Sequence, residues 1–201
     1  MRPTRALVCA GALLILGGLA SWASGFDLQL HPLLRVSAAS IARVPALWLT
    51  MLGGLGTMGP FALVVVLGLV ARGRRQAAIW LFATIASGRL VVEGLKLIVT
   101  RARPPRVDWL DPVASWSFPS SHSAGAMLTG MAIALLVGTR SAFAAAILFA
   151  GLVGWSRLAL GVHWPGDVLA GWGFGLLWVG AANTLRPTTS GAALLDQPRS
   201  P

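Results

Sequence analysis

A histidine and an aspartate four residues apart carry the clearest chemistry in this sequence. His163 is followed by Trp164, Pro165 and Gly166 and then by Asp167. Because Pro165 suits an early position in a helix, we expect Asp167 in the first helical turn, close to the imidazole. A carboxylate there accepts a hydrogen bond from one imidazole nitrogen, fixes the tautomer and leaves the other nitrogen free to attack. A structural clip or a step in a proton relay is the alternative role for such a pair.

A second group of polar residues precedes an apolar stretch, at residues 118–125 (FPSSHSAG). Pro119 followed by Ser120 and Ser121 is typical of a helix start. The free N–H groups of a first helical turn and the helix dipole form an anion-binding site, and His122 stands on that turn. A histidine at the end of a membrane helix is otherwise an interfacial residue, so its role depends on its neighbours.

Three cations accompany these residues. Lys96 and Arg103 are seven residues apart, about two turns of helix, so a helix that continues to Pro104 places both on one face. Arg157 lies at the end of another apolar stretch. Taken alone, such cations also extend to lipid head groups from a helix end.

Two further charges lie deeper in an apolar stretch. Arg89 and Glu93 are four residues apart and Lys96 follows three residues later. Ionisable groups inside a membrane usually face the interior of the helix bundle. We therefore expect Glu93 to hold Arg89 and Lys96 as a structural partner.

The elements that position these residues are predicted to be membrane helices. Of the 201 residues, 56% are hydrophobic and 11% charged, against roughly 25% charged residues in soluble domains. A membrane span needs about 20 mostly apolar residues. Six stretches approach this length, at residues 6–24, 45–71, 76–99, 121–138, 142–160 and 167–185. The first ends in small residues, so a cleaved signal peptide is an alternative interpretation of it.

We therefore predict an all-α, polytopic membrane helical bundle of about six transmembrane helices. Residues 1–185 are expected to form one integral-membrane domain, and residues 186–201 a disordered cytoplasmic tail. Residues 25–44 are mixed in polarity and are expected to connect the first two spans along the membrane surface.

The topology brings the polar clusters together. The loops after the third and fifth spans fall on the same side of the membrane, whatever the absolute orientation. Lys96, Arg103 and Arg157 against the carboxylate of Asp167 make a positive pocket suited to a phosphate. The single cysteine, Cys9, lies in an apolar run, and no acidic pair or His/Cys set is available to hold a metal. These residues indicate phosphoryl transfer through a histidine without a metal.

The placement of arginine and lysine predicts the orientation. With the N-terminus inside, eight basic residues lie on the inner side and seven on the outer side, which barely decides. Setting aside the three cations of the phosphate pocket leaves four outside, so we expect the pocket on the outer face. The inner residues are Arg2, Arg5, Arg72, Arg74, Arg75, Arg140, Arg186 and Arg199, and the outer four are Arg35, Arg43, Arg101 and Arg106. Because the net charge of +10 is scattered between apolar runs, no nucleic acid partner is expected.

The spacing of these residues resembles the signature of the type-2 phosphatidic acid phosphatase superfamily, which also contains lipid phosphate phosphatases and vanadium haloperoxidases. That signature reads K-x6-R-P, then P-S-G-H, then S-R-x5-H-x3-D. In the second part Ser121 replaces the glycine but keeps its backbone N–H group. The matching residues are Lys96, Arg103 and Pro104, then Pro119, Ser120 and His122, then Ser156, Arg157, His163 and Asp167.

The resemblance implies a role for each matched residue and no cofactor. His163 would attack phosphorus to give a phosphohistidine, Asp167 would orient it, and His122 would protonate the departing lipid oxygen. The other matched residues would bind the phosphoryl oxygens and stabilise the transition state. These phosphate ligands are Lys96, Arg103, Ser120, Ser121 and Arg157.

The resemblance also implies a bacterial lipid phosphatase, which we expect in the inner (plasma) membrane. The placement of basic residues described above predicts its active site on the extracytoplasmic face. A lipid phosphate keeps its chains in the bilayer while its head group reaches the outer loops. Candidate substrates are polyprenyl diphosphates such as undecaprenyl diphosphate, phosphatidate and phosphatidylglycerol phosphate. A proton- or anion-coupled transporter using Arg89, Glu93, His163 and Asp167 is the rival from another class. A vanadate haloperoxidase and an inactive scaffold are weaker alternatives, and the sequence leaves the lipid and the oligomeric state open.

Overall fold

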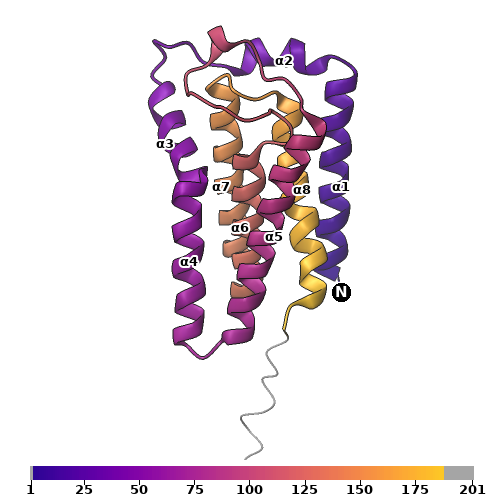
Figure 1. Ribbon diagram of the computed structural model, residues 1–201, viewed down its shortest axis with the longest axis vertical. Coiled ribbons are helices and arrows are strands. Elements are labelled where there is room, and N and C mark those ends of the chain that lie inside the picture. Colours follow the sequence, from indigo (N-terminus) through magenta and orange to yellow (C-terminus); the bar gives the residue numbers. More distant parts are fainter. Residues whose placement is uncertain (1, 188–201) are drawn as a thin grey trace, which may run out of the picture.

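The computed structural model describes residues 2–187 as a bundle of upright α-helices joined by loops (Figure 1). The predicted all-α bundle is confirmed, and most of the predicted tail, residues 186–201, lies outside the described residues. The helices are α1 (Arg2–Ala23), α2 (Phe26–Leu34), α3 (Arg43–Gly53), α4 (Leu55–Ala71), α5 (Arg75–Val99), α6 (Ser121–Val137), α7 (Arg140–Ala159) and α8 (Pro165–Ala182), with 3-10 turns η1 (Arg106–Asp108) and η2 (Asn183–Leu185).

Each of the six predicted stretches coincides with a helix or a helix pair. By length and composition, four helices can cross a membrane: α1, α5, α7, and α8 together with η2. The pair α3 and α4 passes the same test as one span bent by 48°. Helix α6 is apolar but has 17 residues, about 25 Å of helix. It is short because the polar segment before it folds into the bundle, where Ser117 and Ser120 are fully buried.

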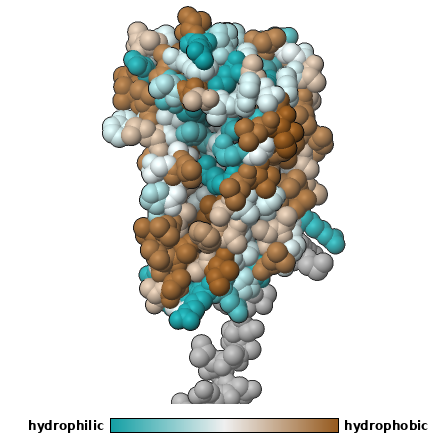
Figure 2. Space-filling model, in the orientation of Figure 1, coloured by the Kyte–Doolittle hydropathy of each residue, from teal (hydrophilic) through white to brown (hydrophobic). Residues whose placement is uncertain are grey.

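Large apolar side chains face outward around the bundle. More than half of the surface of each of these side chains is exposed: Leu13, Leu67, Leu97, Ile98 and Leu148. Figure 2 shows hydrophobic residues over much of the side of the molecule and hydrophilic residues gathered toward the upper end, with a few at the lower end. Contiguous apolar surface of this extent is typical of helices that face lipid.

Gly54 interrupts the second apolar stretch. Its backbone is extended, with φ −68° and ψ 155°, and separates α3 from α4. A Cβ added at Gly54 would lie 3.5 Å from Nε2 of His122. The bend in this helix pair therefore lies beside one of the predicted site residues.

Helix α6 is the centre of the bundle, with α4, α5, α7 and α8 packed against it. Its buried face consists of small and medium side chains such as Ala124, Ala126 and Leu128. Gly175 of α8 allows a close approach, since a Cβ there would lie 2.8 Å from the Cβ of Met127. This packing sets the N-terminus of α6, with its polar first turn, among the other helices at the upper end.

Helices α1 and α8 pack through facing glycines. Gly11 faces Gly173 and Gly18 faces Gly166, and a Cβ on any of the four would lie 2.5 or 2.6 Å from the facing carbonyl oxygen. In both helices the glycines are seven residues apart, a spacing that returns to the same helix face and is typical of close packing through small residues. This contact holds α1 against α8 as far as the residue before Asp167.

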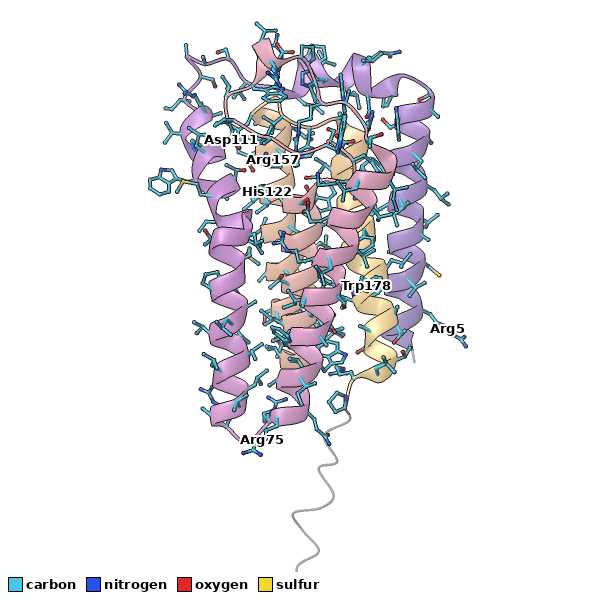
Figure 3. The ribbon with its side chains drawn as sticks, viewed as in Figure 1. Arg5, Arg75, Asp111, His122, Arg157 and Trp178 are labelled. Carbon is cyan, nitrogen blue, oxygen red and sulfur yellow. The ribbon has the colours of Figure 1, made fainter. Side chains whose placement is uncertain are left out.

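The two loops that carry the predicted site meet at one end of the bundle, as the topology predicts. Residues 100–120 and residues 160–164 lie at the upper end in Figure 1, and α2 runs across that end. Arg5 and Arg75, from the predicted inner set, lie toward the opposite end (Figure 3). The basic residues predicted on the inner side and the polar residues of the predicted site therefore lie at opposite ends of the bundle.

Candidate active site

His163 and Asp167 lie together, as their spacing predicts. His163 stands in the turn before α8 and is 1% exposed, and Asp167 lies in the first turn of α8 and is fully buried. Nδ1 of His163 is 3.3 Å from Oδ2 of Asp167. The same oxygen accepts a hydrogen bond of 2.9 Å from the backbone N–H of Trp164, so Asp167 also caps α8.

Arg103 determines which imidazole nitrogen of His163 carries the hydrogen. Its Nη1 lies 3.0 Å from Nε2 of His163. Because a guanidinium only donates, Nε2 must accept, so Nδ1 is protonated and donates to Asp167. Burial, followed by the charges of Arg103, Arg157 and Lys96, lowers the pKa of His163 well below its ordinary value. The imidazole is therefore neutral at neutral pH with its lone pair on Nε2, the form that acts as a nucleophile.

The prediction that a single helix carries Lys96 and Arg103 is wrong. Helix α5 ends at Val99, and Thr100 closes it in the left-handed conformation, with φ 46°. A residue that precedes proline avoids the helical conformation, so Arg103 before Pro104 favours a loop at this point. Arg103 reaches the site from that loop.

Lys96 and Arg103 nevertheless converge. The carbonyl oxygen of Trp116 accepts from Nζ of Lys96 at 2.6 Å and from Nη2 of Arg103 at 3.2 Å. Nη1 of Arg103 also donates to the carbonyl of Val162 at 2.6 Å, which ties the two loops together. Burial and then the charge of Arg157 lower the pKa of Arg103 to about 10, so the guanidinium stays charged at neutral pH.

Arg157 is fully buried in α7 and has unused hydrogen-bond donors. Its Nη1 donates to Oγ1 of Thr50 and, at 2.7 Å, to Oδ2 of Asp111. Its Nε and Nη2 atoms are buried and have no partner within residues 2–187. Buried donors are normally paired, so the N–H groups of these two nitrogens are suited to the oxygens of an anion. Asp111, Arg157 and His122 lie at nearby levels in the upper part of the bundle (Figure 3).

The N-terminus of α6 forms as predicted. Ser120 is the N-cap, and its Oγ accepts from the backbone N–H of Ser123 at 3.4 Å and from the hydroxyl of Ser123 at 3.0 Å. In the described part of the chain, the backbone N–H groups of Ser121 and His122 and the side chain of His122 have no hydrogen-bond partner. These groups are free to meet a ligand.

Glu93 does not hold Arg89 and Lys96, contrary to the prediction. Within residues 2–187 it forms no ion pair with either, and it accepts a hydrogen bond of 2.6 Å from the hydroxyl of Ser121. Arg89 instead donates to the carbonyl of Ser121 at 3.2 Å. Its guanidinium fills the space left by the missing side chain of Gly125, because a Cβ there would overlap it. The hydroxyl that replaces the signature glycine is therefore engaged by α5.

Sequence reasoning missed three residues behind His163. The sequence identifies Arg101 only as a basic residue of the outer side. In the structure it is 7% exposed and donates to Asp167 at 2.6 Å and to Asp27 at 2.5 Å. Ser117 donates to Oδ2 of Asp167 at 2.5 Å. The scarcity of carboxylates, six in the whole chain, is the one signal that marks Asp27.

The assembled site is suited to nucleophilic attack by the imidazole on an atom that carries anionic oxygens. A buried neutral imidazole, oriented by a carboxylate, lies next to three cations and a free helix N-terminus. Across residues 2–187, no group of three or more His, Cys, Asp or Glu side chains lies together in a way that could hold a metal ion.

Comparison with known proteins gives consistent matches. The sequence profile of the PAP2 superfamily matches residues 77–190. An undecaprenyl-diphosphatase from Sulfolobus acidocaldarius is 28% identical over 155 residues, which cover 74% of this chain and 72% of the relative. Phosphatidylglycerophosphatase B from Bacillus subtilis is 30% identical over 138 residues, covering 64% of this chain and 68% of the relative.

A solved structure shares the fold. The crystal structure of a transmembrane PAP2-type phosphatidylglycerolphosphate phosphatase from Bacillus subtilis superimposes with a TM-score of 0.77 at 24% identity, covering 92% of this chain and 96% of that one. With its apolar helices and this membrane-embedded neighbour, the chain is an integral membrane protein.

Proposed function

This chain belongs to the PAP2 superfamily, and from that premise we propose that it hydrolyses a membrane lipid phosphate through a phosphohistidine at His163, without a metal. The relatives named above are lipid phosphatases, so the chain is an enzyme of that class and the transporter alternative is set aside. The observation that carries the proposal is the buried imidazole of His163, with Nδ1 on Asp167 and Nε2 beside Arg103.

In the first step, Nε2 of His163 attacks phosphorus. As the substrate enters, Arg103 transfers its hydrogen bond from Nε2 to a phosphoryl oxygen, which frees the lone pair. The N–P bond forms while the bond from phosphorus to the leaving oxygen breaks, and His122 donates a proton to that oxygen. Asp167 retains the Nδ1 hydrogen bond and offsets the positive charge that develops on the imidazole.

In the second step, water attacks the phosphohistidine. His122, now neutral, takes a proton from the water, the new P–O bond forms and the N–P bond breaks. Inorganic phosphate leaves, and His163 returns to its neutral state with His122 protonated. This sequence returns both histidines to their starting states.

The phosphoryl group is held by charge and by free N–H groups. Lys96, Arg103 and Arg157 supply the positive charge that a phosphoryl transition state requires. The backbone N–H of Ser121 lies at the N-terminus of α6. The hydroxyl oxygen of Ser120 accepts both of its hydrogen bonds from Ser123, so its hydrogen remains available to donate to the phosphoryl group.

An apolar cavity supports a lipid substrate. It has a volume of about 420 Å³ and lies between the α3–α4 pair and helices α6 and α7. Leu52 and Thr57 line it and flank Gly54, which lies beside His122. A lipid chain in this cavity would bring its phosphate to the site. Polyprenyl diphosphates, phosphatidate and phosphatidylglycerol phosphate are the candidates, and the first and third correspond to the names of the relatives.

We place the enzyme in the bacterial inner (plasma) membrane with the site on the extracytoplasmic face. The support is the excess of arginine at the end of the bundle opposite the site, where Arg5 and Arg75 lie.

The test is phosphate release by the protein purified in detergent with a chelator present. Polyprenyl diphosphate, phosphatidate and phosphatidylglycerol phosphate are compared side by side, and at least one should be hydrolysed. The chain has three histidines. Because a phosphohistidine hydrolyses in acid and survives in alkali, the reaction with substrate labelled at the transferred phosphate is quenched with alkali. The label should remain on the wild-type protein and on His31→Ala, and none should remain on His163→Asn. A dependence on divalent metal, or an active His163→Ala protein with an unchanged rate, would overturn the proposal.

A further inference from the structure

Two charged residues outside the signature are buried behind the catalytic pair. Arg101 is 7% exposed and Asp27, from α2, is 1% exposed. Nη1 of Arg101 donates to Oδ1 of Asp167 at 2.6 Å, and Nη2 donates to Oδ2 of Asp27 at 2.5 Å. The guanidinium also lies 4.4 Å from the ring centre of Trp22. Burying an ion pair costs desolvation energy that the pairing offsets only in part, so a role beyond stability is worth seeking for this pair.

Arg101 determines how Asp167 presents its carboxylate. Because Oδ1 is taken by Arg101, the other oxygen, Oδ2, faces His163 and also accepts from Ser117 and the backbone of Trp164. The guanidinium gives one N–H to each carboxylate, and because its donors are fixed in one plane it holds Asp167 and Asp27 in a set geometry relative to each other. The orientation of His163 thus depends on Arg101 through Asp167.

Asp27 in turn holds Arg101 and the start of α8. Its Oδ1 accepts from the hydroxyl of Ser21 at 2.7 Å and from the backbone N–H of Gly166 at 2.8 Å. A Cβ at Gly166 would lie 2.8 Å from Oδ2 of Asp27, so this close approach requires glycine. Asp27 therefore contacts both the guanidinium and the residue directly before Asp167.

Helix α2 has other anchors at the same end. Arg35 pairs with Asp108 at 2.9 Å, and the ring of His31 lies 5.1 Å from that of Trp164. The Asp27–Arg101 pair is therefore one of several contacts that keep α2 on the bundle.

We propose that Arg101 and Asp27 are positioning residues for phosphoryl transfer, acting on His163 through Asp167. One cation between two carboxylates leaves a net charge of −1 behind the imidazole, which offsets the positive charge that develops when Nε2 bonds to phosphorus. This inference rests on the proposed phosphatase function and adds two residues to its machinery.

The test compares Arg101→Gln, Arg101→Lys and Asp27→Asn in the detergent assay. Arg101→Gln should lower kcat by about 10- to 100-fold, by analogy with the hydrogen-bond partners that orient metal-binding histidines, with KM for the lipid phosphate little changed. Arg101→Lys keeps the charge and should recover part of kcat. Arg106→Gln, an exposed cation of the same loop, is the matched control and should retain wild-type kcat.

The pH dependence separates a positioning role from a merely structural one. The titratable and charged groups that face the His163–Asp167 pair are Lys96 from α5, Arg101 and Arg103 from the loop, His122 from α6 and Arg157 from α7, with Asp27 beyond Arg101. Removing the positive charge of Arg101 makes protonation of the pair easier, so the acid limb of the kcat profile moves to higher pH. Removing the negative charge of Asp27 moves it to lower pH. Loss of folded protein alone changes the height of the profile and leaves its shape unchanged.

The possible outcomes distinguish failure of the proposed function from failure of this inference. If the wild-type protein releases no phosphate, the proposed function itself fails. If the wild-type protein is active and both Arg101→Gln and Asp27→Asn keep its kcat and its acid limb, this inference alone is overturned. Where Arg101→Gln does not fold, judged by thermal unfolding in detergent, the profiles of Asp27→Asn and Arg101→Lys decide instead: a shifted limb in the first with an unshifted limb in the second supports positioning, and two unshifted limbs overturn it.

Discussion

Arg157 has two buried nitrogens, Nε and Nη2, whose N–H groups have no hydrogen-bond partner in the described part of the chain. If they bind the phosphoryl oxygens, Arg157→Lys keeps the charge but loses the planar fork of donors. We expect kcat/KM to fall by about 10²- to 10³-fold, the effect of removing one transition-state donor. Steady-state phosphate release in detergent measures this. Arg140→Lys, an exposed arginine at the other end of α7, is the control, and equal kcat/KM in the two variants would contradict the assignment.

The protonation state of His163 affects both the stability and the spectrum of the protein. Burial lowers the pKa of His163 well below its ordinary value of 6.5. The unfolded chain therefore binds this proton at higher pH than the folded one, and the resulting loss of stability sets in as the pH falls below 6.5. In detergent, NMR of histidine labelled with ¹⁵N should show His163 as the neutral, Nδ1-protonated tautomer from about pH 5 to 8. A titration midpoint near 6.5 would contradict the buried, cation-surrounded site.

Residue spacing predicted the part of the site whose residues lie within about one helical turn of each other in the sequence. His163 and Asp167 are four residues apart, and Ser120 directly precedes its helix, so local geometry brings each to its place. Arg101 is separated by 66 residues from Asp167 and by 74 from Asp27. No local pattern encodes such a pair, because it exists only once α2 has packed over the ends of α5 and α8.

At the scale of the elements, apolar length predicted where helices form, but their ends depend on tertiary contacts. Helix α5 stops at Val99 because the residues before Pro104 leave the helical conformation and Arg103 bonds to two loops. Helix α6 begins at Ser121 because the buried Ser120 caps it. The break at Gly54 likewise lies where α3 and α4 pass His122, a neighbour that the apolar pattern of the stretch does not reveal.

The glycine contact between α1 and α8 leads to a prediction about stability. A side chain at Gly173 would meet the backbone oxygen of Gly11 at 2.6 Å and the backbone nitrogen of Ile15 at 2.8 Å. Gly173→Leu should therefore separate the helices and lower the free energy of unfolding by at least about 1–3 kcal/mol, the usual effect of overpacking. Gly17→Leu is the matched control on α1, since a Cβ there meets nothing within 4 Å.

Thermal unfolding in detergent, followed by tryptophan fluorescence, measures both variants. The midpoint should fall for Gly173→Leu and stay near that of the wild-type protein for Gly17→Leu. Because Gly166 lies on the same contact and bonds to Asp27, Gly173→Leu should also lose phosphatase activity. Equal midpoints for the two variants would show that α1 does not depend on this contact.

In the whole molecule, apolar surface and charged groups lie in different places. The sides of the bundle are hydrophobic, and polar groups gather at the end where α2 and the two loops meet (Figures 1 and 2). A phosphate carried by a lipid can reach this end without leaving the bilayer surface. The few carboxylates of the chain include Asp27, Asp108, Asp111 and Asp167, which all pair with basic groups at that end.

The orientation of this end in the membrane can be tested by labelling. The basic residues outside the site favour the arginine-rich end on the cytoplasmic side. In a Cys9→Ser background, a cysteine introduced as Val107→Cys, at a side chain that is 90% exposed in the loop after α5, should react with a membrane-impermeant maleimide in intact spheroplasts. Arg74→Cys, exposed between α4 and α5, should react only after permeabilisation. Because the two positions lie at opposite ends of the bundle, the reverse pattern would put the phosphate site on the cytoplasmic face, and it would overturn the orientation while leaving the chemistry of His163 unaffected.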